Sequence, residues 1–192
     1  MTAEPVPPDF DARWEAVAPV LAEALTKKNQ KVWELVWQSK GNDAFTTGAR
    51  SVSKTISSDM LAHEYFEKHG LELVTQLTET DIAVLRTQLQ NNWGVGERKF
   101  AQIVHDSYVC SEERLKRIYR TEVHQADLHG AYGVAKKIKA KTKTWHSVGD
   151  ERTYDTCLDM DSETVPINEA FSNGLFISHS HPGCRCVATY SH

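Results

Sequence analysis

A change in hydrophobic pattern near residue 140 divides this 192-residue chain into two kinds of structure. Upstream of it, apolar residues recur with the spacing of amphipathic helices. Downstream, short runs alternate polar and apolar residues, as strands do. The sequence therefore predicts an α+β fold, mainly helical over its N-terminal two-thirds, with a small antiparallel β element at the C-terminus.

The helical part begins with two predicted helices and a loop. The first helix should start after Asp9, and Pro19, which lies inside its apolar pattern, should kink it or split it in two. A second helical stretch, KVWELVWQSKG, ends at Gly41. Between Gly41 and Ser57 the residues are small and polar, which predicts a loop.

Further helical patterns follow this predicted loop. One ends at Gly70, the next, TETDIAVLRTQLQNNWG, stops at Gly94, and another is GERKFAQIVHDSY. The longest helix should begin at Ser111 and run to about Lys139. Glu122 lies on or beside the face of this helix that should be buried. A buried carboxylate is costly unless it is paired, so Glu122 needs a partner.

Short strand candidates follow the longest helix, separated by turn-forming residues. They are KTKTWHSV, ETVPI, GLFIS and CRCVATY. At the other end of the chain, residues 1–8 contain three prolines and predict a flexible or docking arm. Residues 9–64 are then a predicted helical N-terminal region.

The composition argues against several classes of protein. A net charge of −4 opposes bulk attraction to nucleic acid, so any DNA contact would need a local basic patch. The stretch MTAEPVPPDF lacks the segments of a secretory signal, and no apolar run approaches the roughly 20 residues that span a bilayer. We therefore expect a protein of a reducing cytoplasm, without membrane contact, whose cysteines are thiols or metal ligands. Cys110 is predicted to be a lone thiol.

A cluster of sulfur and imidazole groups lies near the C-terminus. Cys157, His181, Cys184 and Cys186 form the pattern C-x23-H-x2-C-x-C, with His179 in reserve. Zinc takes such ligands, and a full set without an open position would be a structural site that staples the β element to the helices. The alternative is a set of packed thiols and a hydrogen-bonded histidine without metal. A disulfide between Cys184 and Cys186 is disfavoured by geometry and compartment.

The segment WHSVGDER combines an aromatic residue, a Gly-Asp turn and an arginine. One interpretation makes Asp150 or His146 a general acid or base. The simpler interpretation, which we favour, is a turn whose Arg152 neutralises the buried Glu122, because arginine and carboxylate form bidentate pairs.

A basic run, KKIKAKTK, lies at the end of the longest predicted helix. Such a run is usually a solvated face. It is nevertheless the surface best suited to contact DNA or an acidic partner. The candidate contact residues are Lys136, Lys137, Lys139, Lys141 and Lys143.

Catalytic motifs are otherwise absent from the sequence. It has no P-loop and no G-x-G-x-x-G, H-E-x-x-H or G-x-S-x-G pattern. Two alternatives to a structural protein stay open. One is a metal-dependent nuclease that uses the His/Cys cluster with Glu122, Asp150 or His146, and the other is a nucleic-acid-binding module that uses the lysine run.

Three segments, taken in order, resemble the phage Mu F-like minor head proteins, also called phage head morphogenesis proteins. The segments are RLKRIYRTEVHQADLHGAY, KTWHSVGDERTYDTCLDMD and HSHPGCRC. With a helical lead-in from about Tyr65, the resemblance predicts a head-morphogenesis domain over residues 65–192. This chain has Tyr154 where many members carry the first cysteine of a C-x-x-C pair, which leaves one ligand position fewer.

The resemblance implies a structural virion protein rather than an enzyme. Such a protein is a minor capsid protein of a tailed phage or prophage, associated with the portal inside the head and present in the host cytoplasm during assembly. Its implied roles are procapsid assembly, DNA packaging or DNA ejection. Its implied partners are the portal protein and other capsid components.

Overall fold

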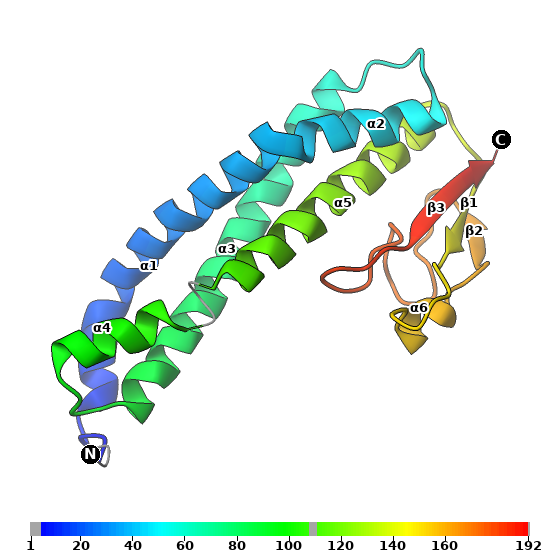
Figure 1. The fold of residues 1–192 in the computed structure, drawn as a ribbon. Helices are drawn as coiled ribbons and strands as arrows, with labels where there is room; N and C mark the ends of the chain where they lie inside the picture. The colour runs from blue at the N-terminus through cyan, green and yellow to red at the C-terminus, as the bar shows by residue number, and fades with distance from the viewer. Residues whose placement is uncertain (1–4, 108–110, 192) are drawn as a thin grey trace. The chain divides into compact units, whose positions relative to one another are not determined.

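The computed structural model describes residues 5–107 and 111–191 of the chain (Figure 1). It confirms the predicted α+β class, because helices are followed by a small antiparallel sheet. Cys110 lies outside the described residues. The elements are α1 (Phe10–Val36), the π-helical turn η1 (Trp37–Gly41), α2 (Asn42–Val52), α3 (Asp59–Asn91), α4 (Glu97–His105), α5 (Glu112–Lys137), β1 (Thr142–His146), α6 (Asp155–Leu158), β2 (Thr164–Pro166) and β3 (Val187–Ser191).

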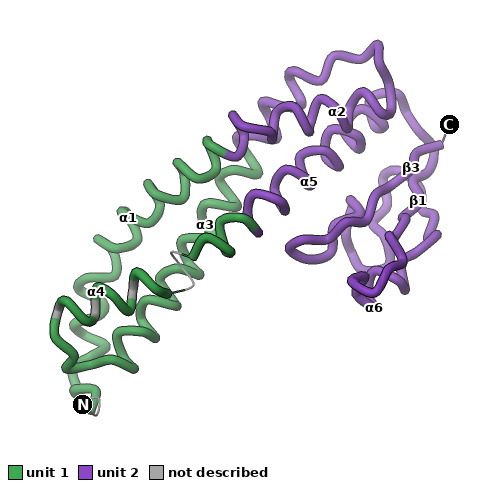
Figure 2. Tube along the Cα trace, in the orientation of Figure 1, with its two compact units in different colours: residues 1–35, 68–116 green, residues 36–67, 117–192 purple. Residues whose placement is uncertain are grey.

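The chain forms two compact units (Figure 2). Unit 1 contains residues 1–35 and 68–116, and unit 2 contains residues 36–67 and 117–192. Among the described residues, no helix combines the length and the apolar character that crossing a membrane would require.

Unit 1 contains a buried polar network centred on Asp81 of α3, here called the Asp81 network. Asp81 is fully buried and forms an ion pair of 2.5 Å with Arg114, which is 3% exposed. Lys28 approaches the same carboxylate to 3.6 Å. The amide of Asn29 donates hydrogen bonds to Asp81 and to Thr78, each of 3.2 Å. The network thus joins α1, α3 and the start of α5 through opposite charges and hydrogen bonds.

Two predicted helix breaks do not occur. Pro19 does not split α1, which runs without interruption from Phe10 to Val36. Pro19 is exposed, so the backbone groups around its ring face solvent. The helix end predicted at Gly70 is also wrong, because α3 continues to Asn91. A Cβ atom at position 70 would lie 2.1 Å from Nε1 of Trp33, so this glycine serves close packing and not termination.

The predicted loop between Gly41 and Ser57 is helical as far as Val52. The small residues in this segment bring α2 close to α5. A Cβ atom at Gly48 would lie 1.8 Å from the carbonyl oxygen of Asp127. Packing between two helices has therefore overridden a composition that is typical of loops.

The C-terminal sheet has the strand order β2-β1-β3, and both strand pairs are antiparallel. Three of the strand candidates are confirmed as β1, β2 and β3. The candidate GLFIS is wrong, since residues 174–178 form bends and irregular backbone and no strand. The core beneath the sheet consists of buried side chains that include three cysteines: Trp145, Cys157, Met160, Phe171, Cys184 and Cys186.

Candidate metal centre

Three buried cysteines meet in the core of the sheet. Cys157 comes from α6, whereas Cys184 and Cys186 come from the segment that leads into β3. Their sulfur atoms all lie within 4.8 Å of one another, and the distance from Cys157 Sγ to Cys184 Sγ is 4.0 Å. Two sulfur ligands of one tetrahedral zinc lie roughly 3.8 Å apart, as follows from a Zn–S bond of about 2.3 Å. The three sulfur atoms therefore have the chemistry and the spacing of a metal site.

His181 lies at the edge of this group of sulfur atoms. Its Nε2 is 3.4 Å from Cys157 Sγ, and its Nδ1 is 3.1 Å from the carbonyl oxygen of Pro182. The mutually close set contains the three cysteines only, so the histidine approaches the cluster from the side of Cys157. The other candidate, His179, is placed near Gln125, with 3.4 Å from its Nδ1 to the amide nitrogen.

Helix α5 supports the segment that carries Cys184 and Cys186. The backbone amide of Gly183 donates a hydrogen bond of 3.0 Å to the hydroxyl of Thr121. The Nε2 atom of His124 donates a bond of 2.9 Å to the carbonyl of Cys186, since a carbonyl oxygen only accepts. Helix α5, which contains the segment RLKRIYRTEVHQADLHGAY, thus holds the backbone of the segment HSHPGCRC.

Asp150 connects the turn after β1 to the cysteine segment. Its carboxylate accepts a bidentate pair of bonds from Arg185, with 2.7 Å for one of them. The hydroxyl of Thr153 also donates to Asp150 at 3.0 Å. The bond from Arg185, together with those from Thr153 and the backbone, holds the pKa of Asp150 well below its usual range.

Glu122 and Arg152, the ion pair that the sequence predicted, lie in different surroundings. Glu122 is 3% exposed, and its charge adds to burial in raising the pKa of Tyr65. Arg152 is exposed, and its guanidinium takes part in none of the ion pairs found among the described residues. The arginine that binds a carboxylate here is Arg185. The sequence offered one indication of this role. Arg185 lies between two cysteines that face inward, and because neighbours in an extended segment face opposite ways, its side chain should face away from the core.

The thiols differ in acidity. Burial and the charge of Cys184 raise the pKa of Cys186 far above its usual value. Burial opposes ionisation of Cys184 as well, but hydrogen bonds from the backbone of Cys186 and Ser180 lower its pKa overall. Three thiolates in one small core repel one another, so full ionisation requires a cation among them.

The residues considered for nuclease chemistry have structural partners. His146 pairs with Thr189 across β1 and β3, with 2.8 Å between Nε2 and Oγ1. Asp150 is paired with Arg185, and Glu122 is buried on α5. These contacts give the nuclease alternative no support.

The lysine run divides into exposed residues and one buried residue. Lys143 alternates inward on β1 together with Trp145 and is only 1% exposed. Its Nζ donates a bond of 2.8 Å to the carbonyl of Phe176. It also lies 4.9 to 5.0 Å from the ring centroids of Tyr132, Phe171 and Phe176. Lys143 is therefore not part of a surface that could contact DNA. The exposed members of the run are Lys136, Lys137, Lys139 and Lys141.

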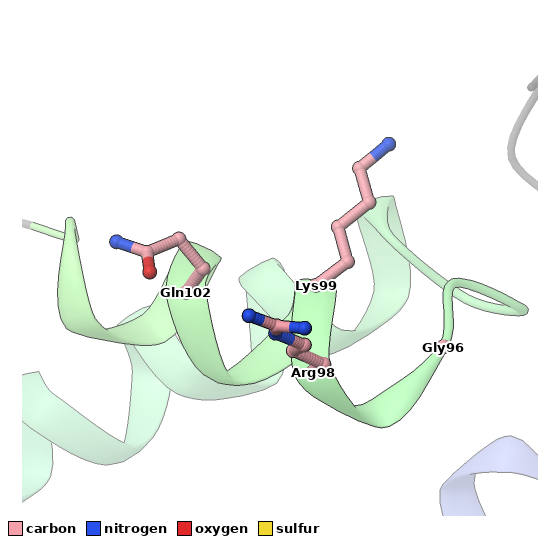
Figure 3. A pocket seen from close by; sticks show the side chains of 4 residues that line it. All are labelled: Gly96, Arg98, Lys99 and Gln102. Carbon is pink, nitrogen blue, oxygen red and sulfur yellow. The ribbon is translucent and has the colours of Figure 1, made fainter.

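Elsewhere, the described residues form two open hollows on the surface. One, of about 540 Å³, lies between α2 and α5 and contains Tyr119 and Arg120 of the first family-like segment. The other, of about 600 Å³, lies on α4 and is lined by Gly96, Arg98, Lys99 and Gln102. The side chains of Arg98 and Lys99 diverge (Figure 3), so they do not converge on one ligand.

The fold and the site define a helical protein with a cysteine-rich β element whose polar groups are held in structural contacts. The chain belongs to the Phage Mu protein F like family, since the model of that family matches residues 84–189. This confirms the resemblance seen in the sequence. Searches of curated proteins and of solved structures found no match.

Proposed function

We propose that this chain is a minor capsid protein of a tailed phage or prophage that acts in head morphogenesis. The observation that carries the proposal is membership of the Phage Mu protein F like family over residues 84–189. We further propose that the protein associates with the portal inside the head and assists procapsid assembly, DNA packaging or ejection. It would be present in the host cytoplasm during assembly and in the virion afterwards. The proposed domain is residues 65–192.

A structural role is supported by the way the polar groups of the C-terminal element are used. Asp150 and His146 are engaged in contacts that fix the fold, and Glu122 is buried. The cysteines are buried in an apolar core. We therefore propose an assembly protein and not an enzyme.

The cysteine cluster is proposed to hold a structural zinc ion. Cys157, Cys184 and Cys186 would supply three ligands, and His181 would supply the fourth. The ion would balance the charge of the thiolates and would join α6 to the segment before β3. Without this link, the two segments are held by the small apolar core and by the bonds from α5 and Asp150.

The exposed lysines at the end of α5 are the proposed contact with DNA or with an acidic surface of the portal. They are Lys136, Lys137, Lys139 and Lys141. Since the chain as a whole carries a net charge of −4, this contact would be local and weakened by salt.

Co-purification with the portal protein of the same genome tests the proposed function. We expect the tagged full chain to retain the portal protein and to enter procapsids when both are expressed with the major capsid protein. A variant with all four exposed lysines changed to glutamine should bind less, and a matched variant with Lys27, Lys31, Lys54 and Lys99 changed to glutamine should bind normally. Absence of the chain from both portal and procapsid fractions would contradict the proposal.

A further inference from the structure

The aromatic ring of Tyr154 stacks on the imidazole of His181. The ring centroids are 4.0 Å apart and the planes are inclined by 15°. Tyr154 is 58% exposed, so the ring is not part of the core. A ring that lies flat against an imidazole limits how far that imidazole can rotate or swing. The stack therefore restricts the direction in which Nε2 of His181 points.

Hydrogen bonding makes Nε2 the basic nitrogen of His181. Nδ1 lies 3.1 Å from the carbonyl oxygen of Pro182, and a carbonyl only accepts, so Nδ1 carries the proton. Nε2 faces Cys157 Sγ at 3.4 Å. A nitrogen and a sulfur ligand of one tetrahedral zinc lie roughly 3.6 Å apart. Histidines that bind metals commonly donate their other N–H to a backbone carbonyl, as this one does.

The backbone ties Tyr154 to Cys157. Tyr154 immediately precedes α6, and its carbonyl accepts bonds from the amides of Cys157 at 2.8 Å and Leu158 at 3.1 Å. The ring that stacks on His181 and the sulfur that faces Nε2 therefore belong to one helical turn. This turn sets both the orientation of the imidazole and its distance from the sulfur.

We propose that Tyr154 is a positioning residue that holds His181 as the fourth ligand of the metal centre. The inference rests on the proposed zinc site and gives a role to a residue outside its ligands. With His181 held in place, a nitrogen fills the fourth position and excludes water. A zinc site with four protein ligands is closed and structural, whereas one with three is open to water.

Cobalt(II) substitution of the full chain tests this role. Thiolate-to-cobalt absorption reports the sulfur ligands, and the ligand-field bands distinguish a nitrogen from a water molecule in the fourth position. For Tyr154→Ala we expect the sulfur absorption to persist and the ligand-field bands to approach those of His181→Ala. Zinc affinity should fall about 10- to 100-fold, as for other residues that orient a ligand. Tyr154→Phe keeps the ring and should restore the spectrum and affinity of the original chain.

The matched control is Tyr119→Ala, because Tyr119 is also an exposed tyrosine (37%) but lies on α5. It should change neither the spectrum nor the affinity. A Tyr154→Ala protein with unchanged spectrum and affinity would overturn the role of Tyr154, and so would a Tyr154→Phe protein that behaves like Tyr154→Ala.

A double variant separates a direct role from an indirect one. In the His181→Ala background, Tyr154→Ala should cause no further loss of affinity, since it acts through His181. A full additional loss would overturn the proposal. If the original chain binds no cobalt through sulfur, the proposed zinc site itself is wrong. If it binds cobalt through sulfur but Tyr154→Ala changes nothing, only the role of Tyr154 is wrong.

Discussion

The two units of the molecule bury polar groups by different means. In unit 1, the carboxylate of Asp81 lies beside the cations of Arg114 and Lys28, so opposite charges compensate each other. In unit 2, the thiols of Cys157, Cys184 and Cys186 are groups of one kind that share an apolar core. The first arrangement is complete with its own residues, whereas the second would be completed by the cation that we propose. Unit 1 should therefore respond to loss of a charge, and the β element to loss of the proposed metal.

The largest effect is expected from breaking the Asp81 network. Asp81→Ala leaves the guanidinium of Arg114 buried without its carboxylate, and the free energy of unfolding should fall by about 3–5 kcal/mol. Denaturant unfolding followed by circular dichroism measures this. Asp11→Ala is the control, because the ion pair of Asp11 with Arg86 is exposed and spans 2.6 Å. Such exposed pairs are worth about 0–1 kcal/mol. Equal losses of unfolding free energy for the two variants would show that the burial of the Asp81 ion pair has no effect on stability.

Removal of metal should have an intermediate effect that is confined to the β element. At zinc concentrations a hundred-fold above the dissociation constant, binding stabilises the folded state by about 2.7 kcal/mol, which a strong chelator would remove. Hydrogen exchange should then accelerate in residues 142–191 and stay unchanged in unit 1. Cys157→Ser should show the same rapid exchange without chelator and no further response to it. Exchange that is insensitive to chelator throughout residues 142–191 would count against a stabilising metal.

The smallest effect is expected from Lys143, a buried cation enclosed by aromatic rings. Burial, with a further contribution from the charge of Lys136, lowers the pKa of Lys143 to about 8. Its pKa in the unfolded chain is about 10.4, so the unfolded state binds more protons between these values and stability should rise with pH there. A pKa difference of this size corresponds to about 3 kcal/mol, and the rings and the Phe176 carbonyl, which favour the charged form, should reduce the rise in stability to the order of 1 kcal/mol.

Lys143→Met tests this dependence, since methionine fits an apolar enclosure but does not titrate. The variant should lose the increase in stability between pH 8 and about 10 that the original chain shows. Lys141→Met, which changes an exposed lysine of the same run, should retain it. An identical pH dependence in the Lys143 variant and the original chain would show that another group is responsible.

The sequence predicted those elements whose structure is determined by their own residues. Helix α5 was expected from Ser111 onward, and the hydroxyl of Ser111 indeed accepts the amide of Arg114 at 3.2 Å, as a helix cap does. The alternation in KTKTWHSV likewise predicted β1. In both cases the signal lies within a few residues of the structure that it specifies.

Predictions failed where a residue far away in the sequence determines the local structure. Gly70 does not end a helix because Trp33 packs on it, and Gly48 does not form a loop because α5 lies against it. The candidate site shows the same division. The spacing of the cysteines predicted a cluster, but not that Arg185, rather than Arg152, would bind a carboxylate nearby. Lys143 belonged to the basic run in the sequence and to the core in the structure.

The α+β class, the family and the residue types of the candidate metal centre follow from the sequence alone, because periodicity and motif order are properties of neighbours along the chain. The tertiary structure was needed to show that Nε2 of His181 faces Cys157, that Tyr154 stacks on His181, and that Asp150 pairs with Arg185. These contacts join residues 24 to 35 positions apart. Their formation depends on how α6, the turn after β1 and the segment before β3 fold over the sheet, which no local pattern specifies.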